Sequence, residues 1–191
     1  MILFGTLLAV SVATPIQAEG LYGNWASDCT PIGKGGRHGI ITRIAIKDGA
    51  IEASARLYAK NDCQTPTLDV DYRGIDLQTN KKEDGILFHH TVASITLTPL
   101  SEAVIAQYNL VDGEVHGCGL KRWALNVPKS VAGRTCDPFY FAQERTTLYD
   151  TAWIADGAVQ FASLPMIWTN TDAGRRTSKP LPIRYSRTAS K

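Results

Sequence analysis

The stretch Leu21-Tyr22-Gly23-Asn24-Trp25-Ala26-Ser27-Asp28-Cys29 decides the fold. A glycine two residues before a tryptophan, at the start of an all-β pattern, is typical of the first strand of a small closed barrel. Gly23 allows a tight bend at the barrel mouth without a Cβ penalty. Trp25 is expected to turn inward and close one end, burying about 150–250 Å² of mostly apolar surface. The alternative is that Trp25 is a core aromatic of a β-sandwich.

Three segments with period two follow this stretch. The sequence alternates apolar with polar residues over 40–47, 51–60 and 68–73, and Asp48-Gly49 between the first two is a hairpin signal. Such alternation indicates antiparallel strands with one face in water. The inward face of the second strand carries Ala53, Ala55 and Ala59, which leaves space for aromatic side chains from across the barrel or for a ligand.

The remaining chain continues the β pattern with one interruption. Residues 86–98 predict a long strand, in which His89 and His90 point to opposite faces and cannot share one metal ion. Residues 99–108 predict the only substantial helix, capped by Thr98 or Ser101. A strand should begin at Trp123, residues 145–164 predict a hairpin, and a last strand near residues 181–185 should close the barrel. The fold class is mainly β, an antiparallel barrel of about eight or nine strands with one helix.

The N-terminus and the cysteines indicate export. Residues 1–18 have no charged side chain and resemble a secretory signal peptide, which leaves residues 19–191 as a single barrel domain. The cysteines form an even set of four: Cys29, Cys63, Cys118 and Cys136. In an exported protein two disulfides are expected, and we favour Cys29–Cys63 with Cys118–Cys136, because local closure is easier than crossed closure. Zinc is the rival interpretation, but the only tight cluster is His116 beside Cys118.

Charge and motifs exclude several function classes. The net charge is +2, and the last segment is a basic tail with no acidic residue after Asp172; it is interpreted as a solvated terminus. No serine nucleophile motif, paired catalytic carboxylates or metal-binding motif is present, so we expect no enzyme, no cofactor and no metal. Nucleic acid is not an expected partner, because aromatic residues do not alternate with the basic ones. No transmembrane anchor is expected after signal cleavage.

Several motifs together are similar to one family. They are residues 23–29, residues 56–67 with their Tyr-x-x-x-x-Cys-x-x-Pro-Thr run, Cys118-Gly119-Leu120, Trp123, and Asn126-Val127-Pro128. This set resembles the domain of the Wnt-inhibitory ectodomains called adenomatosis polyposis coli down-regulated protein, which bacteria have as stand-alone exported proteins. The resemblance covers roughly residues 21–185. It implies a lipocalin-like barrel with a hydrophobic cavity for acylated or lipidic ligands.

The expected function is therefore an exported, periplasmic or secreted, protein that binds a lipid or another small hydrophobic molecule, such as an acyl chain. The candidate ligand-binding residues are Trp25, Ile44, Ala55, Leu57, Phe88, Trp153 and Phe161. The alternative is a protein-binding module of the cell envelope, for example an inhibitor of a secreted protease. In that case mouth loops, and not the interior, would carry the function.

Overall fold

The computed structural model describes residues 20–110, 117–137 and 139–189. The signal peptide predicted for residues 1–18 lies outside these residues. His116, which the zinc interpretation would use, lies outside them as well. Within them the chain forms strands with one short α-helix and two 3-10 turns, Lys34–Gly36 and Ala173–Arg175. The strands and helix are β1 (Gly23–Ser27), β2 (Thr30–Ile32), β3 (His38–Lys47), β4 (Ala50–Tyr58), β5 (Pro66–Lys82), β6 (Gly85–Pro99), α1 (Glu102–Tyr108), β7 (Lys129–Ser130), β8 (Thr135–Cys136), β9 (Phe139–Tyr140), β10 (Thr147–Ala155), β11 (Ala158–Phe161) and β12 (Tyr185–Thr188).

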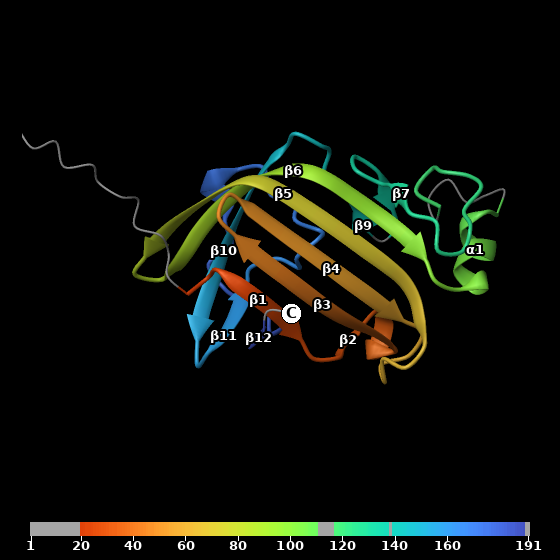
Figure 1. Cartoon of the computed structure of the whole chain (residues 1–191), viewed down its shortest axis with the longest axis horizontal. Coiled ribbons are helices and arrows are strands. Elements are labelled where there is room, and N and C mark those ends of the chain that lie inside the picture. Colours follow the sequence, from red (N-terminus) through yellow and green to blue (C-terminus); the bar gives the residue numbers. More distant parts are fainter. Residues whose placement is uncertain (1–19, 111–116, 138, 190–191) are drawn as a thin grey trace, which may run out of the picture.

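Eight of these strands close into an antiparallel barrel (Figure 1). The order around the barrel is β1-β12-β11-β10-β6-β5-β4-β3, and β3 pairs again with β1. Strand β1 closes the barrel, because it pairs with strands on both sides. Its Trp25 pairs with Arg187 of β12 on one side and with Ile44 of β3 on the other. The mainly β fold, the closed barrel and the single α-helix predicted from the sequence are thereby confirmed.

The alternation in the sequence sets which side chains enter the barrel. On β4, Ile51, Ala53 and Ala55 are buried, while Glu52 and Arg56 are exposed. Asp48 and Gly49 form the turn between β3 and β4, and Gly49 has the positive φ of 69° that this turn requires. The hairpin signal in the sequence is therefore confirmed.

Trp25 is an interior side chain, as predicted. Only 2% of its surface is exposed, and its indole Nε1–H donates to the carbonyl of Leu21 over 2.9 Å. The guanidinium of Arg187 lies 4.5 Å from the ring centre. Arg187 in turn donates to the carbonyls of Tyr22 and Gly20, which ties the last strand to the start of the first.

Two strand predictions are corrected by the structure. The last strand is Tyr185–Thr188 and not residues 181–185, because Pro180 and Pro182 lack the N–H groups that a ladder needs. Trp123 does not begin a strand. Its backbone N–H and carbonyl bond to the side-chain amide of Asn109 at 2.8 and 2.9 Å, so these groups are not available to a neighbouring strand.

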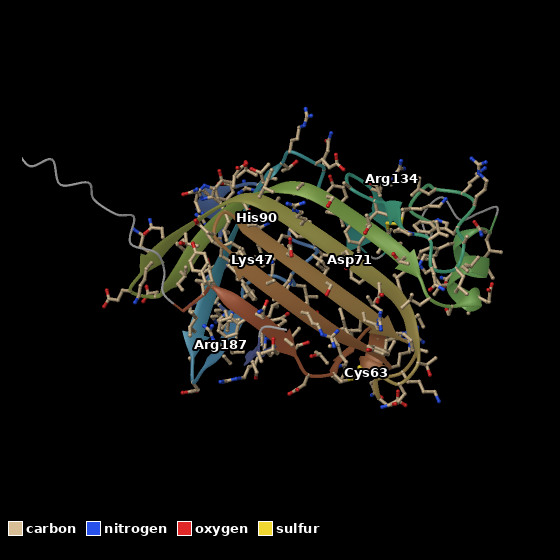
Figure 2. The ribbon with its side chains drawn as sticks, viewed as in Figure 1. Lys47, Cys63, Asp71, His90, Arg134 and Arg187 are labelled. Carbon is tan, nitrogen blue, oxygen red and sulfur yellow. A yellow bond between two sulfur atoms is a disulfide. The ribbon has the colours of Figure 1, made fainter. Side chains whose placement is uncertain are left out.

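The two disulfides have the favoured pairing. Cys29–Cys63 joins the connection between β1 and β2 to the turn between β4 and β5, and Cys118–Cys136 joins the segment after α1 to β8. No cysteine of the described residues is free. Figure 2 shows Cys63 at the end of the sheet where β4 ends, which is also the end that holds the cavity described next.

Candidate functional site: an apolar cavity at one end of the barrel

A cavity of about 680 Å³ lies at the barrel end where β3 and β5 begin and β4 and β6 end. Most of the side chains that line it are apolar. They are Pro31, Ile32, Ile40, Leu57, Leu68, Val70, Leu97, Val104, Tyr108, Phe139, Phe141, Leu164, Met166 and Ile167. A pocket of this size with an apolar lining and few polar groups is typical of a site for a small hydrophobic ligand.

Helix α1 forms one wall of the cavity. Val104 and Tyr108 are four residues apart and therefore lie on the same face of the helix. The helix begins after Ser101, whose side chain accepts a hydrogen bond from the Val104 N–H over 3.3 Å. At the other end, the two hydrogen bonds between Asn109 and Trp123 hold it in place. The helix is thus capped at its start and tied to another segment at its end.

The segment after β11 forms another part of the cavity wall. Leu164, Met166 and Ile167 line the cavity, and the next residue, Trp168, is only 1% exposed. The Trp168 ring packs against Tyr72, His90, Phe88 and Phe161, with ring centres 4.9–6.2 Å apart. Aromatic side chains therefore fill the middle of the barrel, and the cavity is confined to one end.

A buried carboxylate holds this segment. Asp150 on β10 accepts hydrogen bonds from the indole N–H of Trp168 over 2.7 Å and from the backbone N–H of Ser163 over 3.2 Å. Only 2% of Asp150 is exposed, and this burial raises the pKa of its carboxyl to about 6. The hydrogen bonds oppose the shift, because they favour the charged form.

A second buried polar pair lies beside Trp168. The Tyr72 hydroxyl and His90 Nε2 share a hydrogen bond of 2.6 Å. Burial lowers the pKa of His90 to about 3, so the ring is neutral at physiological pH, and it raises the pKa of Tyr72. His89, the next residue, is partly exposed and packs on Tyr149. The two histidines therefore point to opposite faces, as the sequence predicted.

A few polar side chains line the cavity and would orient a ligand: His38, Tyr58, Thr67, Gln107 and Asp137. His38 is already engaged, because its Nδ1 lies 2.9 Å from the carbonyl of Ala59 and its Nε2 accepts from the Arg37 guanidinium over 3.1 Å. Burial raises the pKa of Tyr108 to about 12. The Tyr108 hydroxyl thus stays protonated at neutral pH and can donate a hydrogen bond.

Both disulfides lie close to residues that line this cavity. Cys136 is itself a lining residue. A Cβ placed on Gly39, between the lining residues His38 and Ile40, would come within 2.5 Å of the Cys63 sulfur. Strand β3 therefore packs directly on the Cys29–Cys63 bridge, and this close approach requires glycine.

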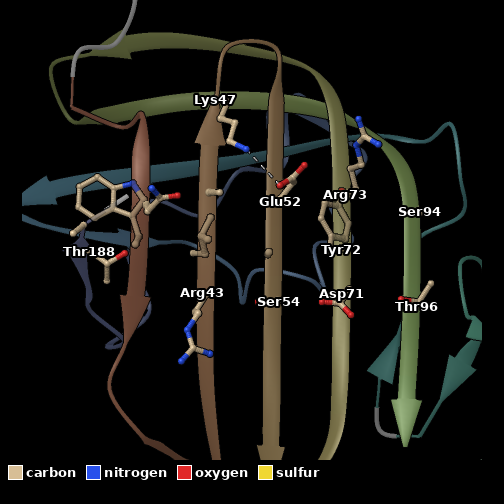
Figure 3. A pocket seen from close by; sticks show the side chains of 16 residues that line it. Arg43, Lys47, Glu52, Ser54, Asp71, Tyr72, Arg73, Ser94, Thr96 and Thr188 are labelled. Atoms are coloured by element: carbon tan, nitrogen blue, oxygen red, sulfur yellow. Dashed lines mark ion pairs between the residues drawn. The ribbon is translucent and has the colours of Figure 1, made fainter. Parts of the chain in front are cut away.

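A second hollow lies outside the barrel, on the outward face of β3, β4, β5 and β6 (Figure 3). Its volume is about 1030 Å³. Polar and charged side chains of both signs line it together with apolar and aromatic residues. The polar and charged ones are Asn24, Arg43, Lys47, Glu52, Ser54, Asp71, Arg73, Ser94, Thr96 and Thr188, and the others are Trp25, Ile44, Ala45, Ala53, Tyr72 and Ala189. Lys47 and Glu52 form an ion pair of 3.9 Å across it. The charged side chains of this outer groove could contact a polar partner.

The structure places the seven sequence-predicted binding residues in three locations. Leu57 alone among them lines the apolar cavity. Trp25, Ile44, Ala55, Phe88 and Phe161 are buried in the packed core, and Trp25 and Ile44 also border the outer groove. Trp153 follows Ala152, which is buried and pairs with Phe161, so Trp153 lies on the opposite, outer face of β10. The predicted set therefore identifies the barrel interior but does not form one site.

Sequence reasoning missed lining residues on the long strands, such as Ile40, Leu68 and Leu97, and also lining residues outside them. Met166 and Ile167 follow β11, and Phe139 and Phe141 lie at and beside a two-residue strand. Neither segment has a periodic pattern that would assign it to an interior. For α1 a signal did exist, because the stripe Val104 and Tyr108 marks the apolar face of a predicted helix.

Comparisons with known proteins leave the site to be judged on its own geometry. The chain matches no protein-family model and no curated protein sequence. In the part of the chain that the structure describes, no three His, Cys, Asp or Glu side chains are grouped so as to hold a metal ion. The helices of that part are too short or too polar to span a membrane.

Proposed function

We propose that this chain is an exported, periplasmic or secreted, protein that binds a lipid or another small hydrophobic ligand in the cavity beside α1. The observation that carries the proposal is the apolar cavity of about 680 Å³ at the end of a closed barrel. Its size falls in the range of about 300–1,000 Å³ usual for small-molecule sites. Two disulfides near it fit an oxidising compartment.

Desolvation would supply most of the binding free energy. Each methylene transferred from water into the cavity contributes about 0.8 kcal/mol, so an alkyl chain of ten buried methylenes gains about 8 kcal/mol before ordering costs. The few polar side chains at the wall, such as Gln107 and Tyr108, would fix the orientation of a head group. The resemblance to the Wnt-inhibitory ectodomain family points to the same ligand class.

A fluorescent fatty acid tests this function on matched variants of α1. Val104 lines the cavity, whereas Ala106 on the same helix is exposed and does not line it. Val104→Trp places an indole in the cavity and should weaken binding at least tenfold, while Ala106→Trp should bind as the wild type does. The proposal fails if the wild type does not bind the probe, or if the two variants bind equally.

A protein-binding role is the second candidate, and the outer groove is the observation that favours it. Alternating charges such as Arg43, Glu52 and Arg73 would select a polar segment of a partner by complementary charge. The test is a pull-down from envelope extract with the wild type and with Arg43→Glu. Loss of one stoichiometric partner in the variant, with no lipid bound by the wild type, would favour this function over the first.

A further inference from the structure

We propose that the outer groove is the contact surface of a homodimer, in which two copies of this chain pack face to face across a two-fold axis. The apolar cavity lies at one end of the barrel, whereas the outer groove lies on the outward face of β3, β4, β5 and β6. The proposal therefore does not rest on ligand binding in the cavity.

Strand pairing arranges eight residues of the outer groove in two adjacent rows, each of which runs across these four strands. Row A consists of Ala45, Glu52, Arg73 and Ser94, and row B consists of Arg43, Ser54, Asp71 and Thr96. Figure 3 shows the labelled members of row A at one level of the sheet and those of row B at the next. The residues between the rows, such as Tyr72 and Ile95, are buried, so both rows face away from the barrel interior.

The two rows complement each other in size and charge, strand by strand. The neighbours in rows A and B are Ala45 and Arg43 on β3, Glu52 and Ser54 on β4, Arg73 and Asp71 on β5, and Ser94 and Thr96 on β6. On β3 and β4 a long charged side chain therefore lies next to a small one. On β5 the two neighbours have opposite charges, and on β6 both are small and carry a hydroxyl group.

A two-fold axis that runs between the rows, parallel to them, would place row A of each copy over row B of the other. Such a contact is isologous, because both copies contribute the same residues. Each strand then faces the same strand of the partner, so Arg73 of each copy lies opposite Asp71 of the other. Glu52 lies over Ser54 and Arg43 over Ala45, where a small side chain leaves room for a long one between sheets that stack about 10 Å apart.

The charges at the centre of this contact are available to a partner. Asp71 and Arg73 are exposed, and neither belongs to an ion pair within the described residues. Asp69, by contrast, accepts two hydrogen bonds of 2.7 and 2.8 Å from Arg56. Partial burial and the Asp69 carboxylate raise the pKa of Asp71. The negative charge of Asp71 is therefore not fully compensated within the chain, and a guanidinium from a second copy would compensate it.

Self-complementarity selects a second copy as the occupant. The outer groove carries charges of both signs, and one orientation of the partner matches all eight positions of the two rows without opposing like charges. A two-fold axis parallel to β4 would instead place Glu52 over Glu52 of the other copy, and like charges in such direct opposition are unfavourable. The charge pattern thus favours one arrangement of the two copies.

Charge reversal tests the proposal by sedimentation-equilibrium ultracentrifugation. Asp71→Arg makes both central positions positive and Arg73→Asp makes both negative, so like charges would meet across the axis in each single variant. The double variant with both substitutions restores opposite charges. Glu83→Arg and Lys82→Asp are the matched controls, because both residues are exposed and neither lines the outer groove. Circular dichroism checks that every variant is folded.

The wild type should have the mass of two chains, with a dissociation constant that rises in about 0.5 M NaCl because salt screens the ion pairs. Each single variant should raise the dissociation constant at least tenfold, whereas the two controls should leave it unchanged. A mixture of the two single variants should form a heterodimer, because each positive side chain then faces a negative one. The double variant should dimerise as the wild type does.

A wild type that is monomeric at about 100 µM would overturn the proposal, and so would single variants that dimerise as the wild type does. The same conclusion follows if the mixture of folded single variants and the double variant both stay monomeric. Stoichiometric capture of a different protein by a monomeric wild type, lost in Arg73→Asp, would assign the outer groove to that partner instead.

The fatty-acid probe separates this result from the proposed function. The single variants should bind the probe with wild-type affinity, because neither Asp71 nor Arg73 lines the apolar cavity. Dimerisation without probe binding would leave the homodimer standing and contradict the ligand proposal. Probe binding by a monomeric wild type would do the reverse.

Discussion

The buried carboxylate of Asp150 accepts a hydrogen bond of 2.7 Å from the indole N–H of Trp168. Asp150 lies on β10, and Trp168 lies on the segment that leaves β11 and enters the barrel. The bond therefore fixes the segment whose preceding residues, Met166 and Ile167, line the cavity. This hydrogen bond thus holds Trp168 in the packed part of the interior, while the residues just before it face the cavity.

Removing this carboxylate should destabilise the fold. Asp150→Ala leaves the Trp168 and Ser163 N–H groups without their acceptor in a dry interior, which should lower the free energy of unfolding by about 2–4 kcal/mol. Asp156→Asn is the matched control, because Asp156 is an exposed residue of the β10–β11 turn with a surface ion pair of 3.6 Å, and asparagine tolerates its positive φ of 51°. It should change stability by less than about 1 kcal/mol. Urea denaturation measures both, and equal losses would contradict the anchoring role.

Two buried titratable side chains, Asp150 and His90, should make the free energy of unfolding depend on pH in opposite directions. Between about pH 4 and 6 the native state binds a proton at Asp150 that the unfolded chain does not, because burial raises the carboxyl pKa from 3.8 to about 6. The stability contributed by Asp150 is therefore lost as the pH rises through this window. His90 has the opposite sign. Its pKa falls from 6.5 to about 3, so its stability contribution is lost as the pH falls below 6.5.

Two variants separate these contributions. Between pH 7 and pH 5, Asp150→Asn should make the loss of stability on acidification larger, and His90→Gln should make it smaller, each by about 1–2 kcal/mol. The measurement is the free energy of unfolding in urea at pH 5, 6 and 7. A wild-type pH dependence in both variants would show that these side chains do not titrate as their burial implies.

Gly74 is expected to be intolerant of a methyl group. A Cβ at this position would lie 2.5 Å from His90 Cδ2 and 2.9 Å from Ile51 Cγ2. Gly74→Ala should therefore cost about 1–3 kcal/mol through overpacking. In a His90→Ala background the same substitution should cost at least 1 kcal/mol less. Thermal and urea unfolding of the four proteins measure the coupling, and additive effects would rule out the clash with His90.

The disulfides should stabilise the barrel mainly by restricting the unfolded chain. Replacing Cys29 and Cys63 together by serine should cost about 3–4 kcal/mol, and replacing Cys118 and Cys136 about 0.6 kcal/mol less, because the sequence separations are 34 and 18 residues. Unfolding in urea, with the reduced wild type as a further control, measures the cost. No loss in either variant would mean that the bridges do not constrain the unfolded chain.

The sequence predicts the barrel far better than the site. Ile40, Ile44 and Ile51 alternate with polar residues around Asp48-Gly49, and this local pattern is enough to specify strands and a hairpin. The cavity depends instead on contacts between distant segments. Met166 and Ile167 have no periodic pattern.

The seven predicted binding residues illustrate the same limit. Most of them mark the interior correctly, but Trp168, which has no strand pattern around it, also enters the core and packs against Tyr72, the cross-strand neighbour of Ala53. Trp153 shows the importance of register. A position one residue from the buried Ala152 is on the outer face, so Trp153 does not enter the barrel.

Copurifying lipid is the most direct measurement of the cavity's function. The mature protein would be isolated from its host without detergent and extracted with organic solvent, and the acyl lipids would be quantified by mass spectrometry. Close to one equivalent is expected for the wild type and for Ala106→Trp, and several-fold less for Val104→Trp. An extract of the wild type without lipid, or equal lipid in Val104→Trp, would contradict a ligand site in this cavity.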